Sequence, residues 1–181
     1  MELGRIDAER LVFVDEMGTH TSLAPLYVYA PVGRRAFLEI PRNRGKNTTL
    51  LTSLHAGGMG PSMAVEGATT ARVFETYTER LLAPALRPAQ IVVMDNLGAH
   101  RPKKVRKLIE ARGCELIYLP PYSPDLNPIE EALSKVKDIL RKIGARTKEA
   151  LIEAMGQALA AVSAQDVRGF FVHCGYRNLA Q

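Results

Sequence analysis

The sequence predicts an α/β fold built on one mixed β-sheet, and three observations support that prediction. Short segments rich in β-branched and aromatic residues alternate with glycine, proline or asparagine, as strands and their turns do. The first of these segments lie close together, which favours antiparallel pairing, whereas the last two each follow a helical pattern, which favours parallel crossovers. The chain of 181 residues also has the usual length of one domain. We therefore expect a single domain over residues 1–181.

The strands are expected first in a meander and then in parallel crossovers. Their predicted ranges are 11–14, 26–30, 35–40, 48–54, 91–94 and 115–119. Apolar residues at helical spacing predict the helices, which are expected at 69–82, 102–111, 128–143, 147–162 and 164–173. The helix at 128–143 has the clearest apolar stripe, and Pro128 suits its first turn.

Composition limits the classes of protein to which the chain can belong. Hydrophobic residues make up 46% and charged residues 24%, and no apolar run approaches the roughly 18 residues of a membrane span. The charged start "MELGRIDAER" is unlike a signal peptide, so we expect a cytoplasmic, nucleoid-associated protein with Cys114 and Cys174 reduced. A net charge of +5 favours a polyanionic partner.

Two aspartates end the apolar segments "LVFV" and "IVVM". Segments without polar alternation are typical of central strands covered on both faces. If these strands are parallel neighbours, Asp15 and Asp95 lie side by side at the carboxyl edge of the sheet, where open α/β sheets bind ligands. Two adjacent carboxylates repel each other, and a divalent cation between them relieves the repulsion. The alternative is that each aspartate only caps a local turn, in "DEMG" and "DNLG".

A third carboxylate would complete a site for a hard metal ion. Glu130 lies in the first turn of the long predicted helix, just after Asn127, which can cap that helix. Glu131 is a rival ligand, but it is turned by about 100° around the helix, so only one of the two can face the site. Asp125 is a weaker rival. The local alternative is that Glu130 closes a capping box onto the Asn127 backbone.

Together "VFVDE", "VVMDNLGAH" and "LPPYSPDLNPIE" resemble the catalytic core of DDE transposases of the mariner superfamily, in particular bacterial insertion-sequence transposases. Thirty-four residues lie between Asp95 and Glu130, the spacing for which the superfamily is known, and "SPDLNPIE" is the most specific motif. The resemblance covers nearly the whole chain. It implies a ribonuclease-H-like fold, with a mixed five-stranded sheet flanked by helices. One departure is Leu133, where relatives often have an aromatic residue.

The resemblance also implies that Asp15, Asp95 and Glu130 are the catalytic, metal-binding triad. Three carboxylates suit two Mg²⁺ ions, with Mn²⁺ as a substitute, because they supply hard oxygen ligands and leave open coordination positions. Our hypothesis is that Asp15 bridges the ions while the other two acidic residues hold one each. The implied reaction is cleavage of DNA at transposon ends, followed by attack of the freed 3′-hydroxyl on target DNA.

Other residues around the triad are secondary candidates. Asn96 and His100 belong to the family-like "DN…H" string, although a loop histidine is more often a surface residue. Four cationic residues share the helix of Glu130 and are the expected DNA contacts, although a solvated helix face has the same pattern. They are Lys135, Lys137, Arg141 and Lys142.

The implied partners are DNA, as transposon ends and target, and a second copy of the chain bound to that DNA. The helix-turn-helix modules that read transposon ends in such proteins are expected to be absent, because Asp15 comes so early. The chain would then be a catalytic fragment, a frameshift partner of an upstream helix-turn-helix polypeptide, or a remnant, and these alternatives stay open.

Three rival functions make different demands on the sequence. A haloacid-dehalogenase-type phosphatase needs a second aspartate two positions after Asp15, where this chain has Met17. A structure-selective nuclease of the same fold would use the same triad on branched DNA. An inactive remnant would regulate a full transposase by binding DNA or by forming mixed oligomers.

Overall fold

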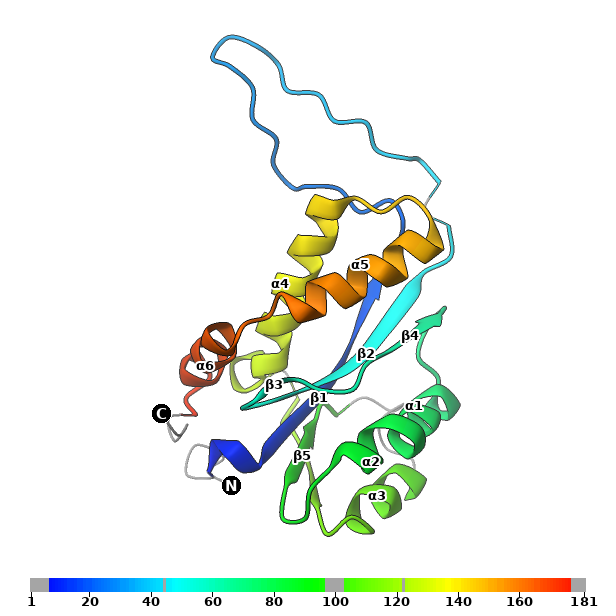
Figure 1. The fold of residues 1–181 in the computed structure, drawn as a ribbon, viewed down its shortest axis with the longest axis vertical. Coiled ribbons are helices and arrows are strands. Elements are labelled where there is room, and N and C mark those ends of the chain that lie inside the picture. Colours follow the sequence, from blue (N-terminus) through cyan, green and yellow to red (C-terminus); the bar gives the residue numbers. More distant parts are fainter. Residues whose placement is uncertain (1–6, 44, 97–102, 122, 177–181) are drawn as a thin grey trace.

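The computed structural model describes residues 7–43, 45–96, 103–121 and 123–176 (Figure 1). Its centre is a mixed sheet in the order β3-β2-β1-β5-β6, with β4 also pairing with β2. The strands are β1 (Leu11–Thr19), β2 (Thr48–His55), β3 (Gly58–Met59), β4 (Met63–Glu66), β5 (Ile91–Met94) and β6 (Glu115–Tyr118).

The predicted mixed α/β sheet is confirmed, with one strand more than the five expected. β1 pairs antiparallel with β2 and parallel with β5, and β5 pairs parallel with β6. Because β1 pairs along the length of β2 on one side, both β3 and β4 use the other edge of β2. The six strands therefore occupy five positions, and the outer position beside β2 is divided between two short strands.

Helices cover both faces of the sheet (Figure 1). One face carries α4, α5 and α6, and the other carries α1, α2 and α3, with a π-helical turn, η3, between α1 and α2. None of the described helices is long and apolar enough to cross a membrane. Their bounds are α1 (Ala71–Tyr77), η3 (Thr78–Leu82), α2 (Ala83–Ala85), α3 (Lys103–Glu110), α4 (Pro128–Ile143), α5 (Lys148–Ala160) and α6 (Ala164–His173).

Each face of the sheet has its own buried core. Phe13 and Val93 pack with α4, α5 and α6, whereas Val12, Val14 and Val92 pack with α1 and α3. Successive residues of a strand point to opposite faces, so β5 and the first four residues of β1 need apolar side chains at every position. This two-sided burial explains why their sequences do not alternate.

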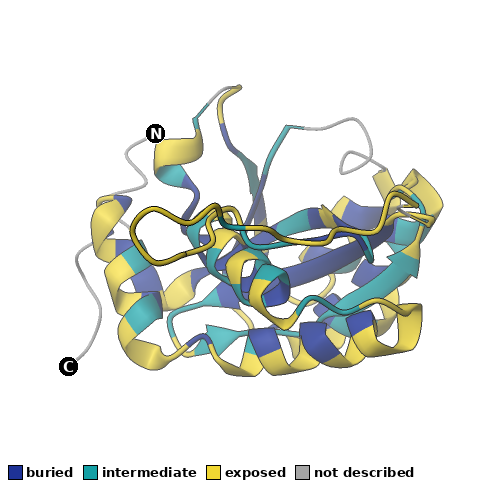
Figure 2. Cartoon of the chain, turned by 90° about the horizontal axis from the view of Figure 1, so that it is seen from above, coloured by how far each residue is buried: buried dark blue, intermediate teal, exposed yellow. Residues whose placement is uncertain are grey.

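The prediction of strands at 26–30 and 35–40 is wrong. Residues 24–43, here called the arm, extend away from the body without pairing to any described strand (Figure 1). Most of the arm is exposed (Figure 2). Tyr29 and Val32 are fully exposed, and Phe37 is 84% exposed. Strand propensity measures how well a residue fits a pleated, half-buried surface, and the arm has no such surface beside it. The meander instead continues through β3 and β4.

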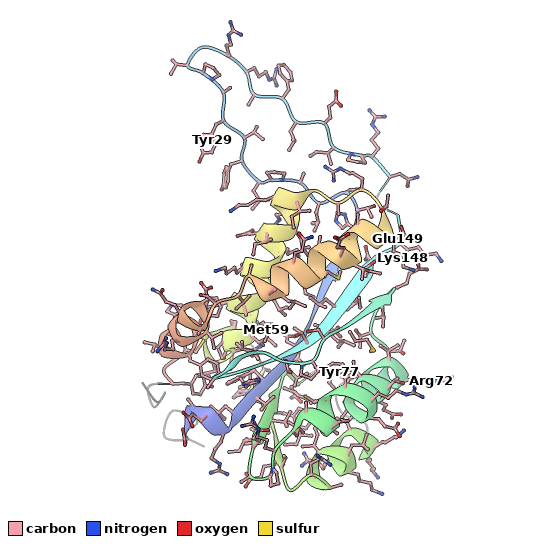
Figure 3. The ribbon with its side chains drawn as sticks, in the orientation of Figure 1. Tyr29, Met59, Arg72, Tyr77, Lys148 and Glu149 are labelled. Carbon is pink, nitrogen blue, oxygen red and sulfur yellow. The ribbon has the colours of Figure 1, made fainter. Side chains whose placement is uncertain are left out.

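The base of the arm is fastened to the body although its tip is free of it. Arg146 Nη1 donates to the carbonyl oxygens of Thr21 and Leu23, at 3.0 and 2.8 Å. Ser22 Oγ donates to the Asn43 carbonyl oxygen at 3.0 Å, which ties the two ends of the arm together. Figure 3 shows Tyr29 well away from the sheet and from Lys148 at the start of α5.

Candidate active site

Asp15 and Asp95 hold matching positions on neighbouring strands. Val14 of β1 and Met94 of β5 are partners in the parallel ladder, and the two aspartates are the next residues. Adjacent strands lie about 4.8 Å apart, so the backbones at these two positions are close neighbours. The predicted register of the two aspartates is therefore present at the carboxyl end of β5.

Strand periodicity turns both aspartates toward α4. Phe13 and Met17 of β1 pack in the core beneath α4, and Asp15 lies between them with the same parity. Val93 packs in that same core, so Asp95, two residues later, has the parity of the same face. Both carboxylates thus belong to the face of the sheet that α4 crosses.

Asn127 joins this face to the start of α4. It follows a short 3₁₀ helix, η5 (Pro124–Leu126), and its side chain makes no capping hydrogen bond, so the expected cap is wrong. Instead, Nδ2 donates to Asp15 Oδ2 at 3.4 Å and to Glu130 Oε1 at 3.3 Å. One amide nitrogen therefore contacts both the Asp15 and the Glu130 carboxylate, although 114 residues separate these two residues in sequence.

The two rival carboxylates lie close to Glu130, and one of them is paired with α6. Glu131 Oε1 lies 2.5 Å from His173 Nδ1 of α6, and this contact raises the pKa of His173. Glu131 is thus directed to α6. This agrees with the prediction that successive residues of a helix, here the two glutamates, point about 100° apart around its axis. Asp125 is exposed, and it lines a shallow pocket of about 480 Å³ with both glutamates.

An aromatic cluster supports the segment that carries Asn127. Tyr176 contacts Phe13 and Phe171, with ring centroids 5.4 and 5.9 Å apart, and its hydroxyl donates to the Leu126 carbonyl oxygen at 2.8 Å. Burial raises the pKa of Tyr176, so the hydroxyl stays protonated and remains a donor. β1, α6 and the turn before α4 are thereby held together beside Asp15.

The donor chemistry of the three acidic residues suits a hard divalent cation, because carboxylate oxygens are the ligands that Mg²⁺ and Mn²⁺ prefer. Across the described ranges, no three His, Cys, Asp or Glu side chains are grouped closely enough to hold a metal ion. Between Asp15 and Glu130, the amide hydrogens of Asn127 occupy the place that positive charge would take. The ligands fit the metal, but they are not grouped around a common point.

The secondary candidates are only partly described. Asn96 is half-buried and directly follows Asp95. His100 lies outside the described residues.

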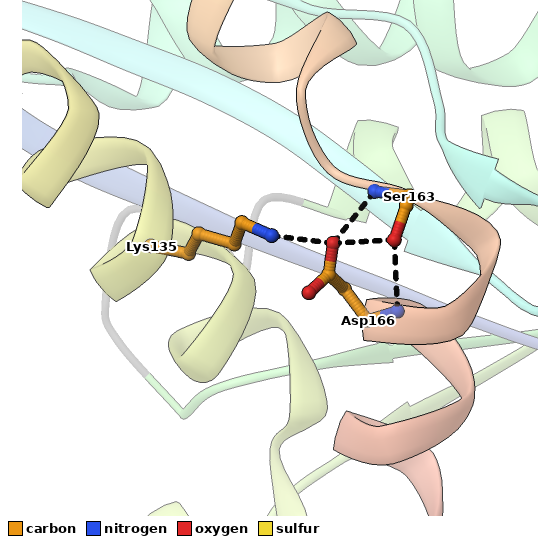
Figure 4. A network of polar contacts seen from close by, with 3 residues as sticks. All are labelled: Lys135, Ser163 and Asp166. Atoms are coloured by element: carbon orange, nitrogen blue, oxygen red, sulfur yellow. Dashed lines mark hydrogen bonds and ion pairs between the residues drawn. The ribbon is translucent and has the colours of Figure 1, made fainter.

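The cationic residues of α4 have different partners. Lys135 Nζ lies 2.5 Å from Asp166 Oδ2 (Figure 4), and Arg141 Nη1 lies 2.6 Å from Asp138 Oδ1. Asp166 also accepts hydrogen bonds from the backbone and hydroxyl of Ser163, the cap of α6. Lys135 and Ser163 lower the pKa of Asp166 to about 2. Lys135 therefore connects α4 to the start of α6.

A cavity of about 530 Å³ lies at the opposite end of the sheet. Val12 and Gln90, at the starts of β1 and β5, line it together with His55 and Arg87. Burial and the nearby Arg87 lower the pKa of His55. Asp15 lies in the middle of β1 and Asp95 directly follows β5, so this cavity is separate from the two aspartates.

Known structures share this fold. The Mos1 transposase paired-end complex with left transposon end superposes with a TM-score of 0.69 and 20% identity, over 93% of this chain and 53% of that one. The Mos1 strand transfer complex gives 0.69 and 22% identity, over 96% of this chain and 56% of that one. The catalytic domain of Mos1 mariner transposase gives 0.63 and 17% identity, over 92% of this chain and 78% of that one.

The chain thus spans about half the length of the Mos1 chains in those two complexes. A search of curated proteins found no significant match. A family model described as DDE superfamily endonuclease matches residues 10–152, which is most of the sequence. The protein therefore belongs to the DDE superfamily of endonucleases, and its fold is that of a ribonuclease-H-like transposase catalytic domain.

Proposed function

We propose that this domain performs the chemistry of DNA transposition, cleaving a DNA strand at a transposon end and joining the freed 3′-hydroxyl to target DNA. One observation supports this most directly: the Asn127 amide contacts Asp15 and Glu130 together. The sequence motif required these two residues to meet across the fold. Had Glu130 only capped its own helix, the proposal would have lost its third carboxylate.

Asp15, Asp95 and Glu130 are the residues that would hold two Mg²⁺ ions, or Mn²⁺ in their place. When bound, the ions supply charge stabilisation for the entering and leaving oxygens of the phosphodiester. The chain supplies the ligand positions: one within β1, one directly after the neighbouring β5 and one in the first turn of α4. Asp15 is central because it neighbours Asp95 through the strand register and Glu130 through Asn127.

DNA is the proposed partner, and α4 is the proposed contact. Lys137 lies seven residues after Glu130, which places both on the same face of the helix about two turns apart. In the described part of the chain, neither Lys137 nor Lys142 forms an ion pair, so their charges are available for phosphate.

The arm supports the proposal that the protein acts as a homodimer on DNA. Large apolar side chains gathered on one exposed segment are typical of interaction surfaces, because leaving them in water is unfavourable. The fastened base and the free tip suit an element that reaches a neighbouring molecule. The exposed large apolar side chains of the arm are Leu26, Tyr27, Val28, Tyr29, Val32, Phe37, Leu38 and Ile40.

The proposal is tested by Mg²⁺- and Mn²⁺-dependent nicking of DNA with acidic-residue variants. Asp95→Asn and Glu130→Gln should each reduce nicking by about 100-fold or more, the scale on which loss of an essential group acts. Glu131→Gln is the matched control, because it makes the same change one residue away on a side chain directed to His173. That control should retain nicking, and circular dichroism should show all variants folded.

Retained nicking in Asp95→Asn or Glu130→Gln would reject the assignment. A structure-selective nuclease would use the same residues, so transposon-end duplexes and branched duplexes should be compared. Preference for branched DNA, with no joining to target, would favour that alternative. A wild-type protein that binds DNA but never nicks it would favour the regulatory remnant.

A further inference from the structure

Asn127 is one of the few buried polar residues of the described chain, with 3% of its surface exposed. Its backbone, at φ −118° and ψ 83°, lies between η5 and α4, and its own N–H donates to the Pro124 carbonyl oxygen at 2.8 Å. A side chain in this place usually caps the helix, yet here it is directed to two acidic residues of the proposed site. The sequence motif did not predict this role.

The chemistry of the neighbours fixes the orientation of the amide. An ionised carboxylate only accepts hydrogen bonds, so the group facing Asp15 and Glu130 must be the NH₂ and not the carbonyl. The two hydrogens of Nδ2 are enough for one bond to each carboxylate. At 3.4 and 3.3 Å these bonds are longer than the usual 2.7–3.2 Å, so they are weak and easily exchanged.

The same amide conflicts with a bound cation. Two neighbouring carboxylates repel each other, and the partly positive NH₂ between them offsets part of that repulsion. A divalent ion held by both Asp15 and Glu130 would bring its positive charge close to the partly positive NH₂ group that now contacts Asp15 Oδ2 and Glu130 Oε1. The amide and the ion therefore compete for the same side of the two carboxylates.

We propose that Asn127 is a positioning residue that holds Asp15 and Glu130 beside each other without metal, and that its amide leaves at least one of them when a divalent ion binds. This inference rests on the proposed function, because it takes both carboxylates as metal ligands. As a consequence, removing the amide donors should lower the thermal stability of the metal-free protein more than that of the metal-bound protein.

Two variants of Asn127 and one control test the inference by thermal unfolding, in EDTA and at increasing Mn²⁺. Asn127→Asp keeps the shape but replaces the donors with a third negative charge. Asn127→Ala removes the donors without adding charge, and covers the case in which the aspartate variant does not fold. Asn43→Asp makes the same chemical change at an exposed residue of the arm, away from both carboxylates.

In EDTA, Asn127→Asp should lower Tm by about 5 °C and Asn127→Ala by about 2 °C, whereas Asn43→Asp should match the wild type. Saturating Mn²⁺ should raise the Tm of both Asn127 variants more than that of the wild type. A purely structural role would lower Tm equally with and without metal. Mn²⁺ binding, followed by electron paramagnetic resonance, should be tighter in both Asn127 variants than in the wild type.

Unchanged Tm in EDTA for both Asn127 variants would overturn the inference, whatever happens with metal. Equal Mn²⁺ shifts in the wild type and the variants would overturn it as well, because the amide would not be displaced. If no protein binds Mn²⁺, including the wild type, the metal site fails, and the displacement fails with it. If Asp95→Asn loses nicking but Mn²⁺ raises the Tm of the Asn127 variants no more than that of the wild type, only the role of the amide is rejected.

Discussion

At the scale of single residues, the cationic side chains of α4 differ in what they contact. Lys135 pairs with Asp166, whose side chain is 25% exposed and also binds the cap of α6. Lys137 has no ion pair among the described residues and shares the helix face of Glu130. A lysine held between two helices contributes to stability, whereas an unpaired one is available for phosphate.

Lys135→Met and Lys137→Met should therefore change different properties of the protein. Lys135→Met should lower Tm by about 2 °C, the scale of a partly exposed ion pair, and leave the salt dependence of DNA binding unchanged. Lys137→Met should leave Tm unchanged and reduce the slope of log K against log salt concentration by about 1, because one phosphate contact is lost. Fluorescence anisotropy with duplex DNA at several salt concentrations measures the slope. A reduced slope in Lys135→Met would show that this lysine leaves Asp166 to bind DNA.

How far the candidate site could be predicted also depends on single residues. Asp15 and Asp95 were predictable because strand pairing places the ends of two apolar segments side by side. The role of Asn127 was not, because a local rule favoured a helix cap, whereas its partner Asp15 lies 112 residues away. Local patterns carry no information about such distant contacts, and the contact to a carboxylate replaced the cap.

At the scale of elements, burial decided which sequence patterns became structure. The helix predicted at 128–143 matches α4, because its apolar stripe packs on the sheet. The segments at 26–30 and 35–40 have equally typical strand composition, but no sheet edge covers them. β3 and β4 were missed because Gly and Pro dominate 57–61. These segments form strands because they lie beside the free edge of β2, and their composition contributes less.

The hydrogen bond between Tyr176, just after α6, and the turn before α4 gives a prediction at this scale. Tyr176→Phe should cost about 1 kcal/mol, since it removes the hydroxyl that binds the Leu126 carbonyl oxygen. Hydrogen exchange should accelerate at the amides of Leu126 and Asn127, which bond within the same turn. Tyr77→Phe is the matched control, because its hydroxyl donates to the Pro61 carbonyl oxygen at 2.9 Å, in the other core.

Both tyrosine variants should lose similar stability, but only Tyr176→Phe should change exchange at the turn before α4. Equal exchange at Leu126 and Asn127 in the two variants would mean that the turn is held by its own backbone bonds and not by α6. The acidic site would then be positioned by α4 and β1 alone.

At the scale of the whole molecule, the arm is the feature that a monomer does not explain. The body buries its own apolar residues in two cores, one on each face of the sheet. The arm adds large apolar side chains in full contact with water, of which Tyr29 is 99% exposed. A second copy of the chain that covers these side chains would remove the unfavourable exposure.

Replacing residues 26–40 with a short Gly-Ser linker should therefore convert a dimer into a monomer. Tm of the body should change by less than about 2 °C, because the removed side chains are exposed and the base of the arm keeps its bonds to Arg146. Analytical ultracentrifugation with and without duplex DNA measures the change in mass. A variant with Tyr27, Tyr29 and Phe37 all changed to serine keeps the length of the arm and should also be monomeric. If both variants remain dimeric, the arm is not the interface. If the wild type is monomeric even on DNA, the homodimer is rejected, and loss of DNA affinity in the linker variant would then assign the arm to DNA.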